Sequence, residues 1–269
     1  MRRLITFPCA RETLVGTLDA AGGATGVLIV SDGNEVRWGA HRGMAMLAAR
    51  MAAAGVPVLR YDRRGVGDSS GENGGFRSSG PDMAAAAAAF RAEQPQLTRL
   101  VGFGNCDAAT ALALFGRTAR VDALVLANPW VVESDGPLPP RAAIRARYAE
   151  RLRYWREWKR LLTGGVDLLG LARGLRRVAT PAARGGLAEE VAAALGGWSE
   201  VTVLLAEGDN TAVAFADAFA GAVFAGVSGG VWVRRRATAS HSFAREGDGD
   251  WVFGRVMEAV RGGGQRAEI

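Results

Sequence analysis

The chain has 269 residues, of which 49% are hydrophobic and 22% are charged, with a formal net charge of +6. This composition supports a sizeable buried core, so it excludes a disordered or collagen-like chain, and the length suits one α/β domain with an insertion. No apolar run reaches the roughly 18 residues of a membrane span, and Pro8 and Arg11 interrupt the basic N-terminus before a signal-peptide core can form. We therefore expect a cytoplasmic protein.

The residues that serve most often in metal and redox sites are scarce. The chain has two cysteines and two histidines, namely Cys9, Cys106, His41 and His241. A zinc site with four Cys or His ligands is therefore not expected. A phosphate-binding Walker loop needs a Gly-Lys pair, which the sequence lacks. We predict no metal and no cofactor.

The positive charge is concentrated in one segment. Residues 141–177 contain eleven basic and three acidic residues, a net charge of +8 against +6 for the whole chain. The sequence has no recognised nucleic-acid reader motif, so nucleic acid is not an expected partner. The segment predicts a solvated helix face, or a dock for coenzyme A, for a carrier-protein phosphate, or for an acidic membrane surface that the protein contacts peripherally.

Strand and helix signals alternate along the first 130 residues. This alternation is typical of a mainly parallel sheet with helices on both faces. The first strand is expected at a sheet edge, and Cys9 before it is expected to be structural. In chain order we expect strands over 13–18, 26–31, 56–61, 99–103 and 123–127, and helices over 41–54, 81–94 and 107–115.

The alternation stops at residue 131 and resumes near residue 198. Residues 131–197 show only helical patterning, with apolar residues near the helical period over 141–162. Strands over 201–206 and 231–235 and helices over 212–220 and 250–260 complete the pattern, and 262–269 is expected to be a loose tail. We therefore predict a core of residues 1–130 and 198–269 and a helical cap over 131–197.

The segment around Cys106 has the pattern of a nucleophile elbow. A strand ends in Gly102-Phe103-Gly104-Asn105-Cys106-Asp107-Ala108 and a helix follows. The residues two positions either side of such a nucleophile must be small, as Gly104 and Ala108 are. A thiol at a helix N-terminus is stabilised as the thiolate by the helix dipole. Cys106 is therefore the predicted nucleophile.

A cysteine nucleophile needs a base, and the base needs an orienting acid. His241 and Asp209 each follow a late strand, in the chain order nucleophile, acid, base of the α/β-hydrolase fold. We predict a Cys106-His241-Asp209 triad, with Glu207 as the alternative acid and His41 as the rival base. The pattern Gly-Val-Ser-Gly-Gly over 226–230 precedes a strand, so its serine is not in elbow context.

An oxyanion hole needs two backbone donors near the nucleophile. The N–H of Asp107 is the first predicted donor, and Gly33 or Asn34, in the loop after the strand over 26–31, is the second. Asp62 to Ser69 is a polar, Gly-rich loop. We expect this loop to brace the elbow through a structural network of Asp62 and its arginines.

Five segments together carry a family resemblance. The chain resembles the α/β-hydrolase superfamily, and within it the exosortase A system-associated hydrolase 1 family, across residues 1–180 and later through Asp209 and His241. The resemblance implies a mostly parallel sheet flanked by helices, with a helical cap, and a hydrolase linked to bacterial exopolysaccharide and protein-sorting gene clusters. The segments are Ser31-Asp32-Gly33-Asn34-Glu35, Asp62-Arg63-Arg64-Gly65-Val66-Gly67-Asp68-Ser69, Gly71-Glu72-Asn73, Gly102-Phe103-Gly104-Asn105-Cys106-Asp107 and Asn128-Pro129-Trp130.

These residues predict an acyl hydrolase of esterase or thioesterase type that forms a thioester acyl-enzyme on Cys106. Its partner would be a small-molecule ester or thioester, free or bound to coenzyme A or a carrier protein. Two alternatives remain open: an acyltransferase with an amine or alcohol acceptor, and a non-catalytic scaffold. The predicted substrate pocket contains Asn105, Trp130, Trp155 and Trp158.

Overall fold

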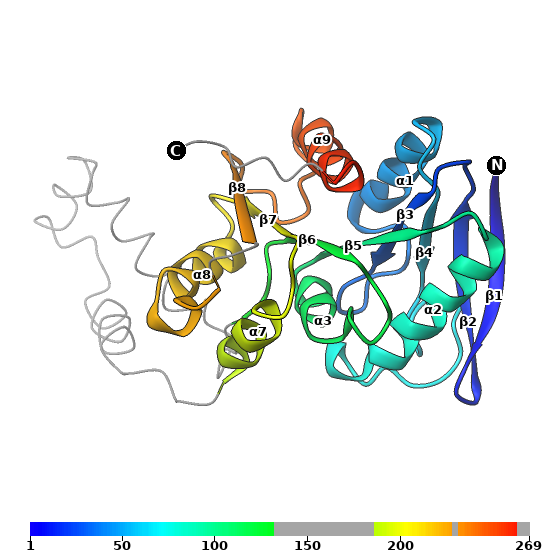
Figure 1. Ribbon diagram of the computed structural model, residues 1–269, viewed down its shortest axis with the longest axis horizontal. Coiled ribbons are helices and arrows are strands. Elements are labelled where there is room, and N and C mark those ends of the chain that lie inside the picture. Colours follow the sequence, from blue (N-terminus) through cyan, green and yellow to red (C-terminus); the bar gives the residue numbers. More distant parts are fainter. Residues whose placement is uncertain (132–185, 228–230, 263–269) are drawn as a thin grey trace, which may run out of the picture.

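An eight-stranded sheet runs through the residues that this computed structural model describes, 1–131, 186–227 and 231–262 (Figure 1). The spatial order is β1-β2-β4-β3-β5-β6-β7-β8, and all neighbours from β4 to β8 are parallel. The predicted mainly parallel sheet is therefore confirmed. The strands are β1 (Arg2–Cys9), β2 (Glu12–Asp19), β3 (Thr25–Val30), β4 (Val58–Tyr61), β5 (Arg99–Asn105), β6 (Ala123–Ala127), β7 (Val201–Ala206) and β8 (Val231–Arg236).

The N-terminal strand β1 differs from the sequence prediction. β1 pairs antiparallel with β2, from Arg2 opposite Asp19 to Cys9 opposite Glu12, so β1 and not β2 forms the sheet edge. No strand was predicted before residue 13, although an edge strand tolerates a proline such as Pro8. Ile5 and Phe7 alternate with exposed residues and are buried in the core.

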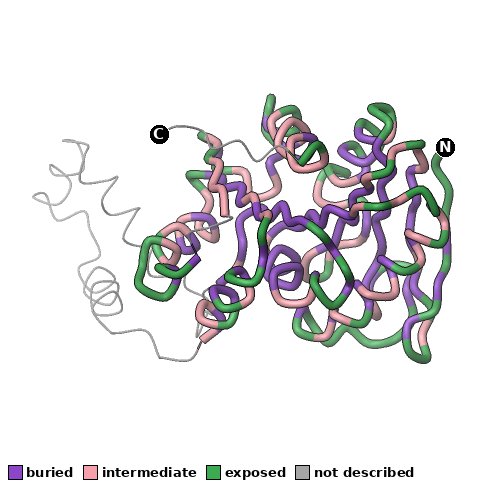
Figure 2. The backbone as a smooth tube through the Cα atoms, viewed as in Figure 1, coloured by how far each residue is buried: buried purple, intermediate pink, exposed green. Residues whose placement is uncertain are grey.

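Helices cover both faces of the sheet and enclose two hydrophobic clusters (Figure 1). One face carries α1 and α9, and the other carries α2, α3, α7 and α8. Figure 2 shows the central strands of the sheet and the inward sides of these helices as buried. The helices are η1 (Ala40–Arg42), α1 (Gly43–Ala53), η2 (Phe76–Ser78), α2 (Gly80–Glu93), α3 (Asp107–Phe115), α7 (Leu187–Leu195), α8 (Asn210–Phe219), η3 (Ala222–Phe224) and α9 (Asp248–Val260).

Most of the predicted cap lies outside the described residues, including the arginine-rich segment over 141–177, Trp155 and Trp158. The end of the same predicted segment contains α7. Its Leu187, Val191 and Leu195 are buried in the cluster beneath α3, so α7 packs on the core. Within the described ranges, no helix combines the length and apolarity needed to cross a bilayer.

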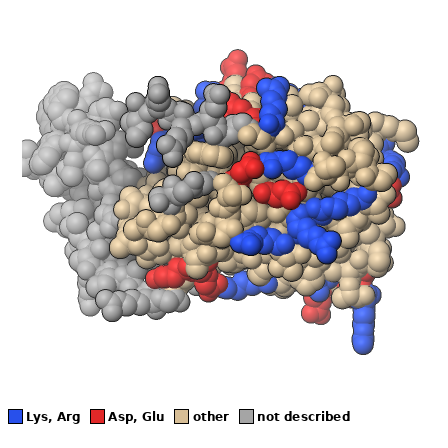
Figure 3. Space-filling model, in the orientation of Figure 1, with Lys and Arg blue, Asp and Glu red and all other residues tan. Residues whose placement is uncertain are grey.

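Charged side chains of both signs are mixed on the surface. On the face shown in Figure 3, Arg side chains lie beside Asp and Glu side chains over the described core. Ion pairs between described residues, such as Arg77 with Glu190 at 2.8 Å and Arg99 with Glu200 at 2.7 Å, also place opposite charges side by side. This face therefore carries no broad region of one sign.

Candidate active site

Cys106 lies in a sharp turn between β5 and α3. Its φ of 55° and ψ of −122° are values that residues other than glycine rarely adopt. The turn requires small neighbours, because a Cβ on Gly104 would lie 2.9 Å from the carbonyl carbon of Ala108. The Cys106 N–H donates to the Ala127 carbonyl at 2.9 Å, which ties the turn to β6. This strand, turn and helix have the geometry expected of a nucleophile elbow.

His241 and Asp209 meet at the carboxyl edge of the sheet. Nδ1 of His241 lies 3.1 Å from Oδ1 of Asp209. Asp209 is the N-cap of α8, and its Oδ2 accepts the N–H groups of Thr211 and Ala212 at 3.0 Å each. The His241 carbonyl accepts the side-chain amide of Asn128 at 2.9 Å. The carboxylate of Asp209 and the backbone of His241 are therefore both held by neighbouring groups.

The hydrogen bonds in this cluster favour a protonated His241 and an ionised Asp209. The sulfur of Cys106, a ring nitrogen of His241 and a carboxylate oxygen of Asp32 lie within 4.8 Å of one another. Hydrogen bonds to Asp209 and then to Cys106 raise the pKa of His241 to about 10, although burial opposes this shift. Burial alone would raise the pKa of Asp209, but its hydrogen bonds, first of all with His241, hold that pKa below its usual value. An imidazolium and a carboxylate therefore form the pair at neutral pH.

Asp32 is the site residue that the sequence analysis missed. It lies two residues after the end of β3, and β3 pairs with β5 so that Val30 lies opposite Gly104 of the elbow strand. Burial, with the nearby carboxylates of Glu35 and Asp107, raises the pKa of Asp32 to about 7. A carboxyl group at the end of a parallel strand beside the elbow strand was the available signal. Among the described residues, Asp32, Cys106 and His241 are the one group of three metal-ligand side chains gathered this closely.

The predicted oxyanion donors lie on either side of the elbow. Asp107 begins α3, so its N–H is an N-terminal helix donor. The Gly33 N–H donates to the side-chain carboxylate of Asp107 at 2.8 Å, and Arg63 donates to the Gly33 carbonyl. The Asn34 side chain accepts the amide of Asn73 at 2.7 Å. In this structure the Gly33 donor is thus already occupied by Asp107.

A cavity of about 310 Å³ adjoins the site between α1 and α9. Asn105, one of the predicted pocket residues, lies on its wall with Glu35 and His41. Its apolar wall includes Met44, Leu47, Phe103, Phe243 and Val252. Cavities of this size accommodate small organic groups.

Trp130, another predicted pocket residue, lies on the opposite side of the sheet from this cavity. Its ring packs edge-on against Phe76, with the centroids 5.8 Å apart, and its carbonyl accepts the Thr110 hydroxyl at 2.6 Å. The ring belongs to the cluster beneath α2 and α3. The remaining two pocket predictions, Trp155 and Trp158, lie outside the described residues.

The alternative triad members occupy other positions. Asp209, and not Glu207, lies against the imidazole, while the Glu207 N–H donates to the Arg236 carbonyl at 3.0 Å. His41 sits on the cavity wall with a φ of 52°. The imidazole that hydrogen-bonds Cys106 is His241. Ser228, the serine of the segment over 226–230, lies outside the described residues.

The loop from Asp62 to Ser69 forms the structural network that the sequence predicted. Buried Asp62 accepts the Arg37 side chain and, at 2.6 Å and 3.0 Å, the N–H groups of Arg37 and Asp68. Arg63 reaches the Gly33 carbonyl beside the elbow. The loop, expected to brace the elbow, contacts the Gly33 segment, whose N–H in turn donates to the Asp107 side chain after the nucleophile position.

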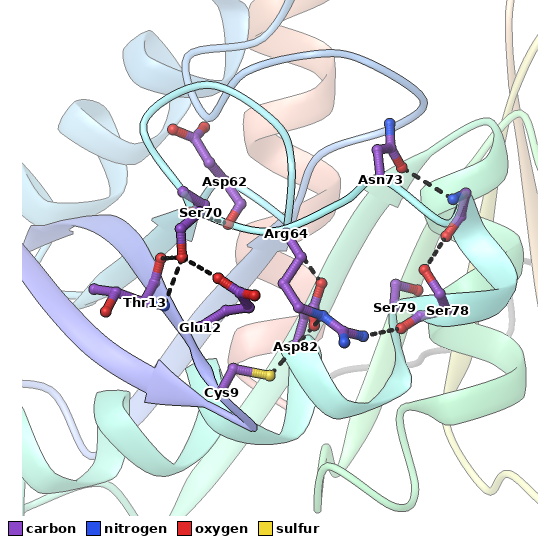
Figure 4. Close-up of polar contacts among 12 residues, drawn as sticks. Cys9, Glu12, Thr13, Asp62, Arg64, Ser70, Asn73, Ser78, Ser79 and Asp82 are labelled. Atoms are coloured by element: carbon purple, nitrogen blue, oxygen red, sulfur yellow. Dashed lines mark hydrogen bonds and ion pairs between the residues drawn. The ribbon is translucent and has the colours of Figure 1, made fainter.

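Arg64 and Cys9 extend the brace to the N-terminal strands (Figure 4). Arg64 Nε donates to Asp82 at 2.5 Å, and its Nη2 donates to the Ser78 carbonyl at 2.8 Å. The Cys9 thiol donates to the same Asp82 carboxylate at 3.3 Å. Burial and Asp82 raise the pKa of Cys9 to about 11, so this thiol stays protonated and unreactive at neutral pH. The structural role expected of Cys9 is confirmed.

Part of the chain matches a known protein family. Residues 37–167, just under half of the chain, match the profile of the family described as serine aminopeptidase, S33. That description specifies serine, whereas the residue at the elbow here is Cys106. No curated protein matches the chain.

Solved structures align with nearly the whole chain. DcsB in complex with its substrate analogue has a TM-score of 0.66 at 15% identity, covering 98% of this chain and 100% of that one. The Pyrococcus furiosus esterase Pf2001 has a TM-score of 0.66 at 14% identity, covering 97% and 92%. XC6422 from Xanthomonas campestris, described as an α/β serine hydrolase without a lid, has a TM-score of 0.60 at 14% identity, covering 100% and 97%. The chain therefore has the α/β-hydrolase fold.

Proposed function

We propose that this chain with the α/β-hydrolase fold is an acyl hydrolase of esterase or thioesterase type, with Cys106 as its nucleophile, His241 as its acid and base, and Asp209 as the orienting carboxylate. The observation that carries the proposal is the strained elbow at Cys106 with the hydrogen-bonded pair of His241 and Asp209 facing it. Strain at a non-glycine residue costs on the order of 1–3 kcal/mol and persists mainly at functional sites.

The first step is acylation of Cys106. The thiolate sulfur attacks the carbonyl carbon of the ester or thioester, a C–S bond forms, and the carbonyl oxygen becomes an oxyanion beside the N–H of Asp107. The oxyanion then collapses, the bond to the leaving group breaks, and the His241 imidazolium gives its proton to the departing oxygen or sulfur. The raised pKa of His241 keeps that proton available at neutral pH.

The second step is hydrolysis of the thioester. Part of the raised pKa of His241 comes from its hydrogen bond to Cys106, and acylation of the sulfur removes that interaction. The pKa of His241 then falls, so the neutral imidazole accepts a proton from water as the water oxygen attacks the thioester carbon. The C–S bond breaks, the acid is released, and the thiolate and imidazolium are restored.

The substrate proposal rests on the cavity beside Asn105. Its apolar wall, with Phe103 and Phe243, suits an apolar acyl group. The carboxyl group of Glu35 at the same wall disfavours binding of an anionic acyl group. We propose a small-molecule ester or thioester as the substrate, and a role beside exosortase-linked gene clusters on the strength of the sequence motifs alone.

Intact-protein mass spectrometry tests the proposal. The wild type and the variants Cys106→Ala, His241→Ala and Cys9→Ala are incubated briefly with p-nitrophenyl esters and acyl-coenzyme A thioesters. We expect one acyl adduct on Cys106 in the wild type and in Cys9→Ala, none in Cys106→Ala, and slow adduct formation in His241→Ala. Adducts that persist in Cys106→Ala, or no adduct and no turnover with any substrate, would overturn the proposal and favour a scaffold. Adding an amine acceptor distinguishes transfer from hydrolysis by the product formed.

A further inference from the structure

A second cavity, of about 560 Å³, opens at the N-terminal edge of the sheet on the α1 face. β1 and β2 extend beyond α1 there, so this part of the sheet face is left open (Figure 1). β1 buries Ile5 and Phe7 against the α2 face, which leaves Leu4 on the α1 face with 65% of its surface exposed. Five of the lining residues are arginines, namely Arg2, Arg3, Arg37, Arg42 and Arg60, and none is acidic.

Arg60, at the floor of this cavity, is a buried cation with an unused donor. It is 2% exposed in β4, and burial lowers its pKa. Nη1 donates to the Arg37 carbonyl at 3.0 Å, and Nη2 reaches Asp19 at 3.4 Å. Nε of Arg60 is buried without a hydrogen-bond partner. An orphaned buried guanidinium N–H is costly unless a ligand or water completes it.

The arginines that line this cavity outnumber the carboxylates that pair with them. Asp19 serves both Arg60 and Arg2, whose Nε donates to it at 2.6 Å. The Arg42 side chain has no hydrogen bond or ion pair with any described residue. Arg3 pairs with Glu93, and Arg37 pairs with Asp62 and Asp68, so the five guanidinium groups are set against four carboxylates among the described residues. An excess of one positive charge therefore remains at the cavity.

An aromatic ring completes the wall. Trp38 is 45% exposed, and the Arg37 guanidinium lies 4.8 Å from the centre of its ring. The backbone between Trp38 and α1 is held in left-handed conformations at His41, with φ 52°, and at Arg42, with φ 60°. Trp38 and Arg42 both line the cavity.

We propose that this cavity binds a nucleoside phosphate, whose phosphate oxygens accept hydrogen bonds from Arg42, Arg60 and Arg2 and whose planar base lies against Trp38. The fork geometry of guanidinium suits phosphate oxygens. The volume of about 560 Å³ falls in the range of sites for ligands much larger than inorganic phosphate. The aromatic face supplies the stacking surface that a base requires.

The site is separate from the acyl chemistry. None of its lining residues belongs to the proposed triad, so the inference stands or falls independently of the function proposed for Cys106. The loop between β3 and η1 nevertheless carries Asp32 at one end and Trp38 further along, so both sites share one segment.

Isothermal titration calorimetry of the full chain with ADP tests this inference. We expect saturable binding that weakens between 50 mM and 200 mM salt, as an ionic contact requires. Pyrophosphate and adenosine serve as separate arms, and each is expected to bind more weakly than ADP. Cys106→Ala should bind ADP unchanged, which separates this site from the candidate active site.

Matched variants locate the binding. Arg42→Ala, at an exposed side chain, should weaken ADP binding about 10-fold or more, as expected for loss of a charge-assisted hydrogen bond. Trp38→Ala should bring ADP affinity down to that of pyrophosphate. Arg11→Ala, which removes an equal charge at the far end of the β1-β2 hairpin, should leave affinity unchanged.

Three results would overturn the inference. The first is that ADP shows no saturable binding at millimolar concentration. The second is that Arg11→Ala and Arg42→Ala weaken ADP binding equally. The third is that the wild type binds pyrophosphate as tightly as ADP. The last would indicate a phosphate site with no role for Trp38.

Discussion

Nδ1 of His241 lies 3.1 Å from Oδ1 of Asp209, while the other oxygen of the same carboxylate caps α8. One side chain therefore orients the imidazole and begins a helix. The two tasks can be separated by substitution, because an amide oxygen also accepts the cap hydrogen bonds but carries no charge.

Asp209→Asn should therefore slow acylation while leaving the fold intact. The same substitution in a serine triad lowers kcat about 10⁴-fold because the imidazole is left in the wrong tautomer, and we expect a fall of roughly 10²- to 10⁴-fold here. Stopped-flow release of p-nitrophenol measures the rate, and thermal unfolding verifies the fold. Glu207→Gln is the matched control and should retain the wild-type rate. Equal rates in Asp209→Asn and the wild type would show that this carboxylate does not orient the base.

Asp32 should make acylation decline as the pH rises through about 7. Its pKa is raised to about 7, so above that pH a negative charge appears within 4.8 Å of the Cys106 sulfur and opposes the charge that develops on the oxyanion. Asp32→Asn is neutral at every pH and should keep the low-pH rate at pH 8. The measurement is the pH profile of the acylation rate.

Glu35→Gln provides the control for this profile. Glu35 helps to raise the pKa of Asp32 through its negative charge, so the variant should retain the inflection but move it to lower pH. An inflection near pH 7 that survives in Asp32→Asn would assign the titration to another group.

The elbow should tolerate no side chain at Gly104. An added Cβ would lie 2.9 Å and 3.0 Å from the carbonyl carbon and oxygen of Ala108, so Gly104→Ala should destabilise the fold by about 1–3 kcal/mol. Gly254→Ala in α9 meets nothing within 4 Å and should stabilise by about 0.5–1 kcal/mol. Urea unfolding of both variants measures the pair of effects. Equal changes in the two variants would show that the elbow is not tightly packed.

The interaction of His241 with Asp209 and Cys106 should stabilise the fold most at low to neutral pH. The folded-state pKa of His241, about 10, exceeds its ordinary value of 6.5, so the folded state retains a proton that the unfolded chain releases between these values. The stabilisation is therefore complete below about pH 6.5 and is lost as the pH rises toward 10. The difference in unfolding free energy between the wild type and His241→Gln should shrink over that interval. A difference that stays constant from pH 6 to pH 10 would contradict the raised pKa.

Local hydrophobic patterns in the sequence predicted most of the strands. The alternation of apolar runs with helical segments predicted β2 to β8, because a strand buried on both faces must be continuously apolar. β1 was not predicted because it opens with three exposed residues, Arg2 to Leu4, and then alternates buried residues with exposed ones that include Pro8. The strand exists because β2 offers an unpaired edge, which no local propensity records.

The spacing of residues within one segment predicted the elbow. Contacts between residues far apart in the sequence could be identified only from the folded structure. Gly104, Cys106 and Ala108 are close in sequence, so the requirement for small neighbours was readable there. The choice of Asp209 over Glu207 depends on where β7 ends and α8 begins, and sequence patterns locate such ends only within one or two residues.

The sheet class, the elbow and the residue types of the proposed triad could be predicted from the sequence, because each depends on periodicity or spacing within a short segment. The position of Asp32 beside Cys106 and the hydrogen bond from the Gly33 N–H to Asp107 could be found only in the folded chain. The same is true of the cavity that arginines from β1, β4 and the loop before α1 line together. These features depend on which strands are neighbours and on how deeply a charge is buried, and both are properties of the assembled sheet.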